Sequence, residues 1–134
     1  MKLMTQIRHI MSRDPVAVQK DKSVYEAVRL MNQRDIDCLI VTENFVPVGI
    51  FTTTDLRVRV VGEGRNPKET PIHAVATKDV KIMKDTDEAL LARRMMAEHG
   101  VKHMPIVDGG GLLVGMLSVT DLVGSLGHDT QILK

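Results

Sequence analysis

The order of apolar and polar residues along the chain predicts the same succession of elements twice. In the first half, a short apolar run at residues 16–18 predicts a strand, and apolar residues at helical spacing predict a helix over residues 24–34. A second apolar run at residues 38–41 predicts another strand, which leads through a turn to a third strand and a second helix. The second half repeats this order, with the corresponding runs at residues 81–83, 88–99 and 104–107. Both halves read β-α-β-β-α, which predicts an α+β fold.

Helix-end signals support these ranges. Ser23 with Glu26, and Asp85 with Glu88, have the spacing of a capping box, in which a side chain at the helix start and one three residues later bond reciprocally to the backbone. Gly100 stands where a helix commonly ends in a left-handed residue. The main helix of each half is therefore bounded by its own local chemistry.

The two halves also align residue by residue. Ile7 aligns with Ile72 and Ser12 with Thr77, a separation of 65 positions (72 minus 7). One extra glycine in the run at residues 109–111 makes the separation 66 from there onward. A duplication explains this agreement, because repeats tolerate insertions best at exposed turns.

A segment rich in glycine and proline, residues 62–71, separates the two copies and is the predicted linker. The first copy is predicted to span residues 7–61 and the second residues 72–127. A unit of this size cannot cover its own sheet, so we expect the copies to pack through their sheets about a pseudo-two-fold axis and share one core.

A junction from strand to helix occurs in both copies, at residues 49–55 and 115–121, and reads Gly, two apolar residues, a hydroxyl residue, two more residues and Asp. The hydroxyl residue can cap the following helix, and the Asp falls in its first turn. Helix amides attract anions, and an ionised carboxylate accepts hydrogen bonds from a vicinal diol. The junction therefore predicts a site for a phosphate beside a ribose.

Composition narrows the classes of function. The chain has 134 residues, a formal net charge of +1, three aromatic residues and one cysteine, Cys38. The near-zero charge gives no general basis for binding nucleic acid or a membrane surface, and one cysteine forms no disulfide within the chain. No apolar run approaches a membrane span and no signal sequence is visible, so a cytoplasmic location is expected.

Three features together resemble the tandem CBS-domain pair, or Bateman module, of the free-standing bacterial type. They are the Ile-Met-Ser and Pro-Val sequences within residues 10–16, the stretch Glu-His-Gly-Val-Lys-His-Met-Pro-Ile-Val-Asp at residues 98–108, and both junction motifs. The resemblance covers about residues 7–124. It implies a non-catalytic regulatory module without a catalytic cofactor, which binds AMP, ADP or ATP, with S-adenosylmethionine a less favoured ligand. It also implies a homodimer and an effector protein of unknown identity.

The resemblance also implies roles for residues at the motif positions. By this resemblance the ribose hydroxyls are bound by Asp55 and Asp121. The residues implied to contact phosphate are Thr52, Thr54, Ser118, Thr120, Lys102 and His103. The residues implied to wall the adenine are Val16, Ala17, Leu39, Ile82 and Met104.

The two copies differ at these positions. Where the second copy has Lys102 and His103, the first has Asp37 and Cys38, and a carboxylate there should repel phosphate. We therefore predict that the cleft of Asp121 binds phosphate better, provided that each cleft is built mainly from one copy. If phosphates cross the pseudo-axis, the assignment swaps.

Other features leave alternatives open. Ala76 stands in the second copy where the first has Met11. Arg57 and Arg59 follow the first motif and suit either an additional phosphate contact or a solvated helix face. His99 and His103 have the spacing of two metal ligands on a helix, but Gly100 between them interrupts the helix, so no metal site is predicted. The competing reading of the whole chain is a dimerisation or interaction adaptor whose clefts hold no ligand.

Overall fold

A computed structural model of the chain describes residues 4–126, with side chains as far as residue 123. The last residue predicted for the second copy, 127, lies outside the described residues. The chain is a mixed α+β protein with two three-stranded sheets, and it divides into two compact units. One, the first-repeat unit, comprises residues 16–80. The other, the second-repeat unit, comprises residues 81–126 together with residues 4–15.

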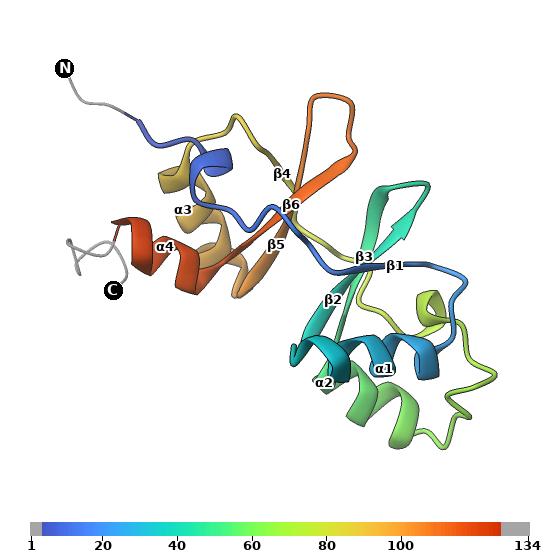
Figure 1. Cartoon of the computed structure of the whole chain (residues 1–134). Helices are drawn as coiled ribbons and strands as arrows, with labels where there is room; N and C mark the ends of the chain where they lie inside the picture. The colour runs from blue at the N-terminus through green and yellow to red at the C-terminus, as the bar shows by residue number, and fades with distance from the viewer. Residues whose placement is uncertain (1–3, 127–134) are drawn as a thin grey trace. The chain divides into compact units, whose positions relative to one another are not determined.

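The first-repeat unit contains a sheet in the order β1-β2-β3, with β1 parallel to β2 and β2 antiparallel to β3. In chain order its elements are β1 (Ala17–Gln19), α1 (Val24–Arg34), β2 (Cys38–Glu43), β3 (Val46–Thr52), a short α2 (Thr53–Asp55), the π-helix η2 (Leu56–Val61) and the 3₁₀-helix η3 (Ile72–Ala74). Helix α1 and Val60 of η2 pack on one face of the sheet, against Leu39, Val41 and Phe51. In Figure 1 α1 and α2 lie on the same side of β2 and β3.

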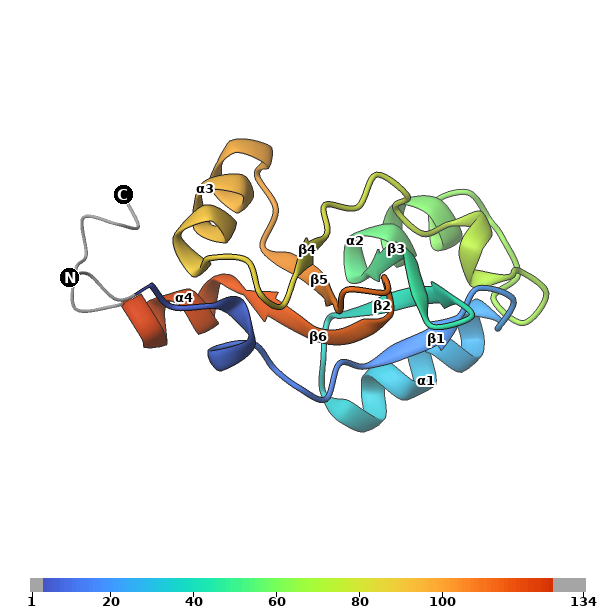
Figure 2. The same cartoon turned by 90° about the horizontal axis from the view of Figure 1, so that it is seen from above.

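The second-repeat unit repeats this topology in a sheet of order β4-β5-β6. Its elements are the 3₁₀-helix η1 (Ile7–His9), β4 (Met83–Lys84), α3 (Ala89–His99), β5 (His103–Val107), β6 (Leu113–Ser118) and α4 (Val119–Leu126). Ala89, Ala92 and Met96 of α3 pack with Met104 and Leu117 of the sheet. Figure 2 shows β5 and β6 with α4 continuing directly from the end of β6.

Each unit is completed by the first segment of the other copy. Ile7, which begins the first copy, is fully buried in the core of the second-repeat unit. Its repeat partner Ile72 is fully buried in the core of the first-repeat unit. Backbone bonds hold both: Ile7 donates to the Asp87 carbonyl at 2.9 Å, and Ile72 donates to that of Lys22 at 2.7 Å. The first segment of each copy therefore packs in the unit of the other copy. We call these the exchanged segments: residues 4–15 in the second-repeat unit and residues 72–80 in the first-repeat unit.

The predicted linker is structured rather than free. Thr70 is buried, and its carbonyl accepts from the amide of Val24 at 2.9 Å. The amide of Tyr25 bonds to the carbonyl of Pro67 at 3.0 Å. These bonds tie the segment before Ile72 to the start of α1, so the linker closes the first-repeat unit.

The predicted helix-end signals are confirmed for α1 and for the end of α3, but not for the start of α3. The Ser23–Glu26 capping box forms, and Gly100 ends α3 in the left-handed region at φ 65°. The capping box predicted at Asp85 and Glu88 is wrong. Helix α3 begins one residue later than predicted, with Glu88 as its N-cap and no side-chain cap bond. The Thr5 carbonyl accepts from the amide of Ala89 at 2.8 Å, so a neighbouring backbone group serves this helix start.

The helix after the first junction is also irregular. It has one α-turn, α2, followed by the π-helix η2, whose end is marked by a bond from the amide of Gly62 to the carbonyl of Arg57 at 2.8 Å. No helix within residues 4–126 is both long enough and apolar enough to cross a membrane.

Candidate functional site

The junction between β6 and α4 forms the first part of the candidate site. The Ser118 hydroxyl accepts from the amide of Asp121 at 3.3 Å, and Asp121 Oδ2 accepts from the amide of Ser118 at 2.9 Å. This reciprocal cap holds the carboxylate at the start of α4, where the helix dipole favours negative charge.

The strand beside the junction brings the predicted basic residues to the same place. His103 is the direct cross-strand partner of Ser118 in the β5·β6 ladder. The carbonyl of Lys102 accepts from the amide of Val119, the first residue of α4, at 3.1 Å. The hydroxyls of Ser118 and Thr120 lie 2.7 Å apart. The backbone thus places Lys102 and His103 next to the two hydroxyls and the Asp121 carboxylate at one corner of the second-repeat unit. These residue types offer donors to an anion and an acceptor to a diol.

The first-repeat unit has the same backbone framework with different side chains. Cys38 is the cross-strand partner of Thr52, and the carbonyl of Asp37 accepts from the amide of Thr53 at 3.1 Å. An exposed carboxylate and a buried thiol thus stand where the other unit has Lys102 and His103. This corner offers no basic side chain at the equivalent positions.

The Asp55 carboxylate is occupied by its neighbours. Oδ2 accepts from the amide of Thr52 at 3.0 Å and from its hydroxyl at 3.2 Å. Oδ1 accepts from the hydroxyl of Thr77 at 3.1 Å and lies 3.6 Å from Nε of Arg59. With only 5% of its surface exposed, Asp55 has little acceptor capacity left for a ribose. We call Asp55, Thr52, Thr77 and Arg59 the Asp55 lock.

The Asp121 carboxylate has no such lock. Ser12, the repeat partner of Thr77, pairs through its backbone with Met116, as Thr77 does with Ile50. Within residues 4–123, however, no side-chain bond joins Ser12 to Asp121, and no hydrogen bond reaches Oδ1 of Asp121. The position equivalent to Arg59 is a serine at 125. Asp121 is also only half-buried, so one carboxylate oxygen remains available to a ligand.

The predicted adenine-wall residues divide into two groups. Leu39 and Met104 have no exposed surface and lie inside the two cores. Val16 and Ala17 are half-buried beside or in β1, and Ile82 is 37% exposed just before β4. An apolar surface for a base can therefore come from the latter three but not from the two core residues in this conformation. Thr54 is exposed and is not part of the Asp55 lock.

The Cys38 thiol is a poor nucleophile near neutral pH. Cys38 is 6% exposed, and burial, followed by the nearby charge of Asp37, raises the pKa of its thiol to about 11. Since the thiolate is the reactive form, Cys38 is unsuited to nucleophilic chemistry near neutral pH.

Thr77 and Arg59 act on the first motif in a way that sequence reasoning missed. Thr77 was visible as the partner of Ser12, and Arg59 stands four residues after Asp55, the spacing of a helical ion pair. The Arg59 side chain is 47% exposed. It pairs with Asp55 and donates to the carbonyl of Ala76 at 3.3 Å.

Comparisons with known proteins agree with this repeated architecture. The family model described as CBS domain matches twice, at residues 7–62 and 72–128. A mitochondrial CBS domain-containing protein of Arabidopsis thaliana is 30% identical over 114 residues, covering 81% of this chain and 55% of that protein. An uncharacterized protein of Methanopyrus kandleri is 28% identical over 118 residues, covering 87% and 60% respectively. The chain thus spans little more than half the length of these two curated relatives.

Solved structures show the same fold. A protein with CBS domains from Burkholderia ambifaria has a TM-score of 0.80 and 31% identity, covering 95% of this chain and 97% of that one. A hexameric CBS-CP12 protein from bloom-forming cyanobacteria has a TM-score of 0.77 and 25% identity, covering 91% and 68%. A CBS domain protein from Pyrobaculum aerophilum complexed with AMP has a TM-score of 0.77 and 23% identity, covering 88% and 90%.

Proposed function

The chain belongs to the CBS domain family and contains two CBS domains. From this premise we propose that it is a regulatory module that binds an adenine nucleotide at the Asp121 corner. Asp121 Oδ1 accepts the ribose hydroxyls, and the hydroxyls of Ser118 and Thr120 with the bases Lys102 and His103 hold the phosphates. The observation that carries the proposal is the available carboxylate oxygen of Asp121 beside two hydroxyls and two bases. The AMP bound by the Pyrobaculum protein of the same fold belongs to the proposed ligand class.

The Asp55 corner contributes little to nucleotide binding in this proposal. A ribose at Asp55 would have to displace the hydroxyl of Thr77 or the guanidinium of Arg59. A phosphate at Thr52 would approach the carboxylate of Asp37, which stands where the second copy has Lys102. Both costs act against the same ligand, so we infer one nucleotide site per chain. The remaining predicted contacts, Thr54 and the wall residues Val16 and Ala17, then serve at most a weak site.

The proposed module is not an enzyme, and its output is conformational. A nucleotide favours whichever arrangement of the module binds it better, and it shifts the population by no more than its differential affinity. We propose that this shift is sensed in trans by an effector protein in the cytoplasm.

A homodimer is part of the proposal. Val119 and Val123 are exposed at 38% and 45% and stand four residues apart on α4, so they share one helix face. Val58 and Val61 of η2 are exposed at 47% and 70%. A second copy of the chain would bury these side chains, and the hexameric cyanobacterial protein supports self-association in this fold.

Calorimetric titration of the full chain with AMP, ADP and ATP tests the proposal. Binding to the wild type is expected near one nucleotide per chain, with loss of measurable heat in Asp121→Ala. Lys102→Gln should weaken ATP binding more than adenosine binding, because it removes charge from the phosphate end only. Asp55→Ala is the matched control and should retain the site.

The competing function is an adaptor that dimerises or binds a protein without a nucleotide. The Asp55 lock favours it for one corner, since a carboxylate consumed by internal bonds has a structural role. Absence of heat with every adenine nucleotide, together with an intact dimer, would establish the adaptor and overturn the sensor.

A further inference from the structure

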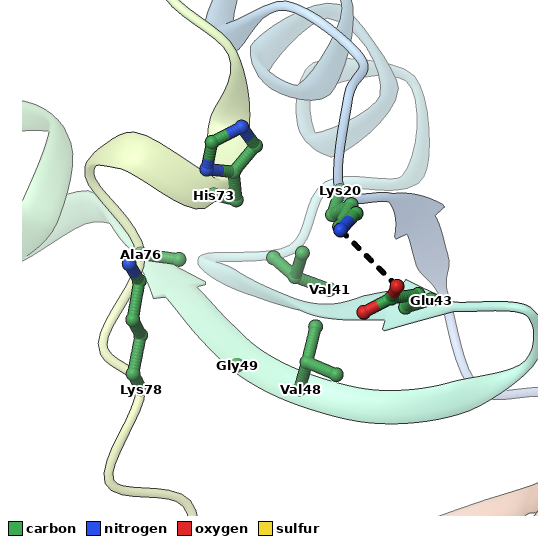
Figure 3. Close-up of a pocket in the computed structure, with 8 residues that line it drawn as sticks. All are labelled: Lys20, Val41, Glu43, Val48, Gly49, His73, Ala76 and Lys78. Atoms are coloured by element: carbon green, nitrogen blue, oxygen red, sulfur yellow. Dashed lines mark ion pairs between the residues drawn. The ribbon is translucent and has the colours of Figure 1, made fainter.

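A second candidate site lies in the first-repeat unit, away from the nucleotide motif. A pocket of about 180 Å³ is lined by Lys20, Val41, Glu43, Val48, Gly49, His73, Ala76 and Lys78. Figure 3 shows Val41 and Val48 between the charged side chains, with His73 and Lys78 on the side of the exchanged segment and Lys20 and Glu43 opposite. All eight residues belong to one compact unit.

The pocket exists because Ala76 replaces the methionine of the repeat. In the second-repeat unit the partner of Ala76 is Met11, and its side chain lies over Gly115. A Cβ built on that glycine would fall 2.5 Å from Met11 Sδ. In the first-repeat unit a Cβ on the partner, Gly49, would meet the Thr77 carbonyl oxygen at 3.0 Å and the Ala76 methyl at 3.4 Å. Truncation of methionine to alanine leaves open the space that the other copy fills.

The pocket is separate from the Asp55 lock. Ala76 and Lys78 line it, whereas Thr77 between them turns its hydroxyl to Asp55. The Thr77 backbone pairs with Ile50 of β3, which holds the segment against the sheet. Within residues 76–78, Thr77 therefore belongs to the Asp55 lock, whereas Ala76 and Lys78 form part of the pocket wall.

The walls combine an apolar floor with a cationic rim. Val41 is 1% exposed and Ala76 is 3% exposed, and Gly49 is buried between them and contributes no side chain. On the rim Lys20 pairs with Glu43 at 3.2 Å and is thereby neutralised. Lys78 makes no ion pair with any residue in the described part of the chain, and His73 adds a second polar group. The uncompensated charge of the rim is positive.

We propose that this pocket is a second ligand site, which takes a small organic anion with an apolar body about the size of a benzene ring. An apolar cavity of about 150 Å³ suffices for benzene, so the volume suits such a body. The body contacts Val41, Val48 and Ala76, and the carboxylate or phosphate lies beside Lys78 and His73. This site is independent of the proposed nucleotide site, which lies in the other unit.

Amide chemical shifts of the full-length protein test the proposal with benzoate, phenyl phosphate and the neutral analogue benzamide as probes. Benzoate or phenyl phosphate should shift the amides of Gly49 and Ala76 and saturate in the millimolar range, as expected for ligands of this size. Whichever anion binds more tightly identifies the acid group. Benzamide should bind more weakly than both.

Two variants decide between a built site and nonspecific attraction. Ala76→Met restores the side chain of the other repeat and should abolish the shifts. Lys78→Gln should weaken both anions about two- to fivefold and leave benzamide unchanged. Lys84→Gln, on the other unit, is the charge-matched control and should have no effect.

The proposal is overturned if neither anion shifts Gly49 and Ala76 at millimolar concentration, or if benzamide binds as well as the anions. It is also overturned if folded Ala76→Met binds like the wild type. Should Ala76→Met fail to fold, Lys78→Gln decides alone, and unchanged anion affinity in that variant contradicts the proposal.

Discussion

Replacing the two motif carboxylates one at a time should separate a structural Asp from a ligand-binding Asp. Asp55→Ala removes the acceptor for the amide and hydroxyl of Thr52 and for the hydroxyl of Thr77. Loss of the Asp55 half of the capping box costs up to about 1 kcal/mol, since the Thr52 hydroxyl still accepts from the amide of residue 55. Donors left unsatisfied in a partly buried place cost about 1–3 kcal/mol. The ion pair with Arg59, which is 47% exposed, adds less than about 1 kcal/mol because solvent screens it.

The expected loss for Asp55→Ala is therefore about 1–4 kcal/mol of unfolding free energy, dominated by the partly buried hydrogen bonds. Asp121→Ala removes one reciprocal cap at a half-buried position, which corresponds to about 0.5–1 kcal/mol. The expectation that Asp55→Ala loses more stability than Asp121→Ala depends on the Asp55 lock alone and not on any ligand.

Urea denaturation of the nucleotide-free proteins measures this difference. Tyr25 is the one tyrosine of the chain and belongs to the first-repeat unit, so its fluorescence reports the unit that contains Asp55. Circular dichroism reports both units together. Thr77→Val keeps the shape of the side chain but removes one donor to Asp55, and it should cost about 0.5–1.5 kcal/mol. Equal losses for Asp55→Ala and Asp121→Ala, or a negligible loss for Asp55→Ala, would refute the reasoning.

Further predictions concern the thiol, the uncapped helix and the exchanged segments. Iodoacetamide at pH 8 should modify Cys38 at least about 100-fold more slowly in the folded protein than in urea, because a pKa near 11 suppresses the thiolate; a rate equal to that of the unfolded chain contradicts its burial. Since the folded pKa is raised, the stabilisation from the neutral thiol is present below about pH 9 and is lost as the pH rises towards 11. Cys38→Ala should remove that part of the alkaline loss. Glu88→Ser supplies the missing cap of α3 and should raise the melting temperature by the equivalent of about 0.5–1 kcal/mol; no rise would mean that the Thr5 carbonyl already satisfies this helix start. Ile72→Ala should speed hydrogen exchange in α1 and Ile7→Ala in α3, and the opposite pairing would contradict the exchange of segments.

Sequence periodicity was enough to predict the order of strands and helices in both copies, because each element buries one face with its own period. The capping residues Ser23 and Gly100 were equally predictable, since their bonds are local. Glu88 was not, because its helix start is served by Thr5, which is distant in sequence and comes from the exchanged segment.

The exchange itself could not be read from the repeat. Ile7 and Ile72 are related by the duplication, and that relation is the same whichever core receives each side chain. Only the three-dimensional packing distinguishes them, and it places each in the unit of the other copy.

The difference between the two motif corners was half predictable. The aligned copies differ in charge at one pair of positions, where the first copy has Asp37 and Cys38 and the second has Lys102 and His103. This difference can be seen in the sequence directly. The Asp55 lock depends on Thr77, 22 positions away, reaching the carboxylate with a single hydroxyl. No local pattern predicts such a bond.

The most direct measurement for the central claim is a crystal structure of the full chain grown with saturating AMP. The account predicts ribose hydroxyls within hydrogen-bond distance of Asp121 and a phosphate near Ser118 and Lys102, with the bonds from Thr52 and Thr77 to Asp55 unchanged. A ribose bound at Asp55 with the Asp121 corner empty, or no nucleotide at either corner, would contradict it.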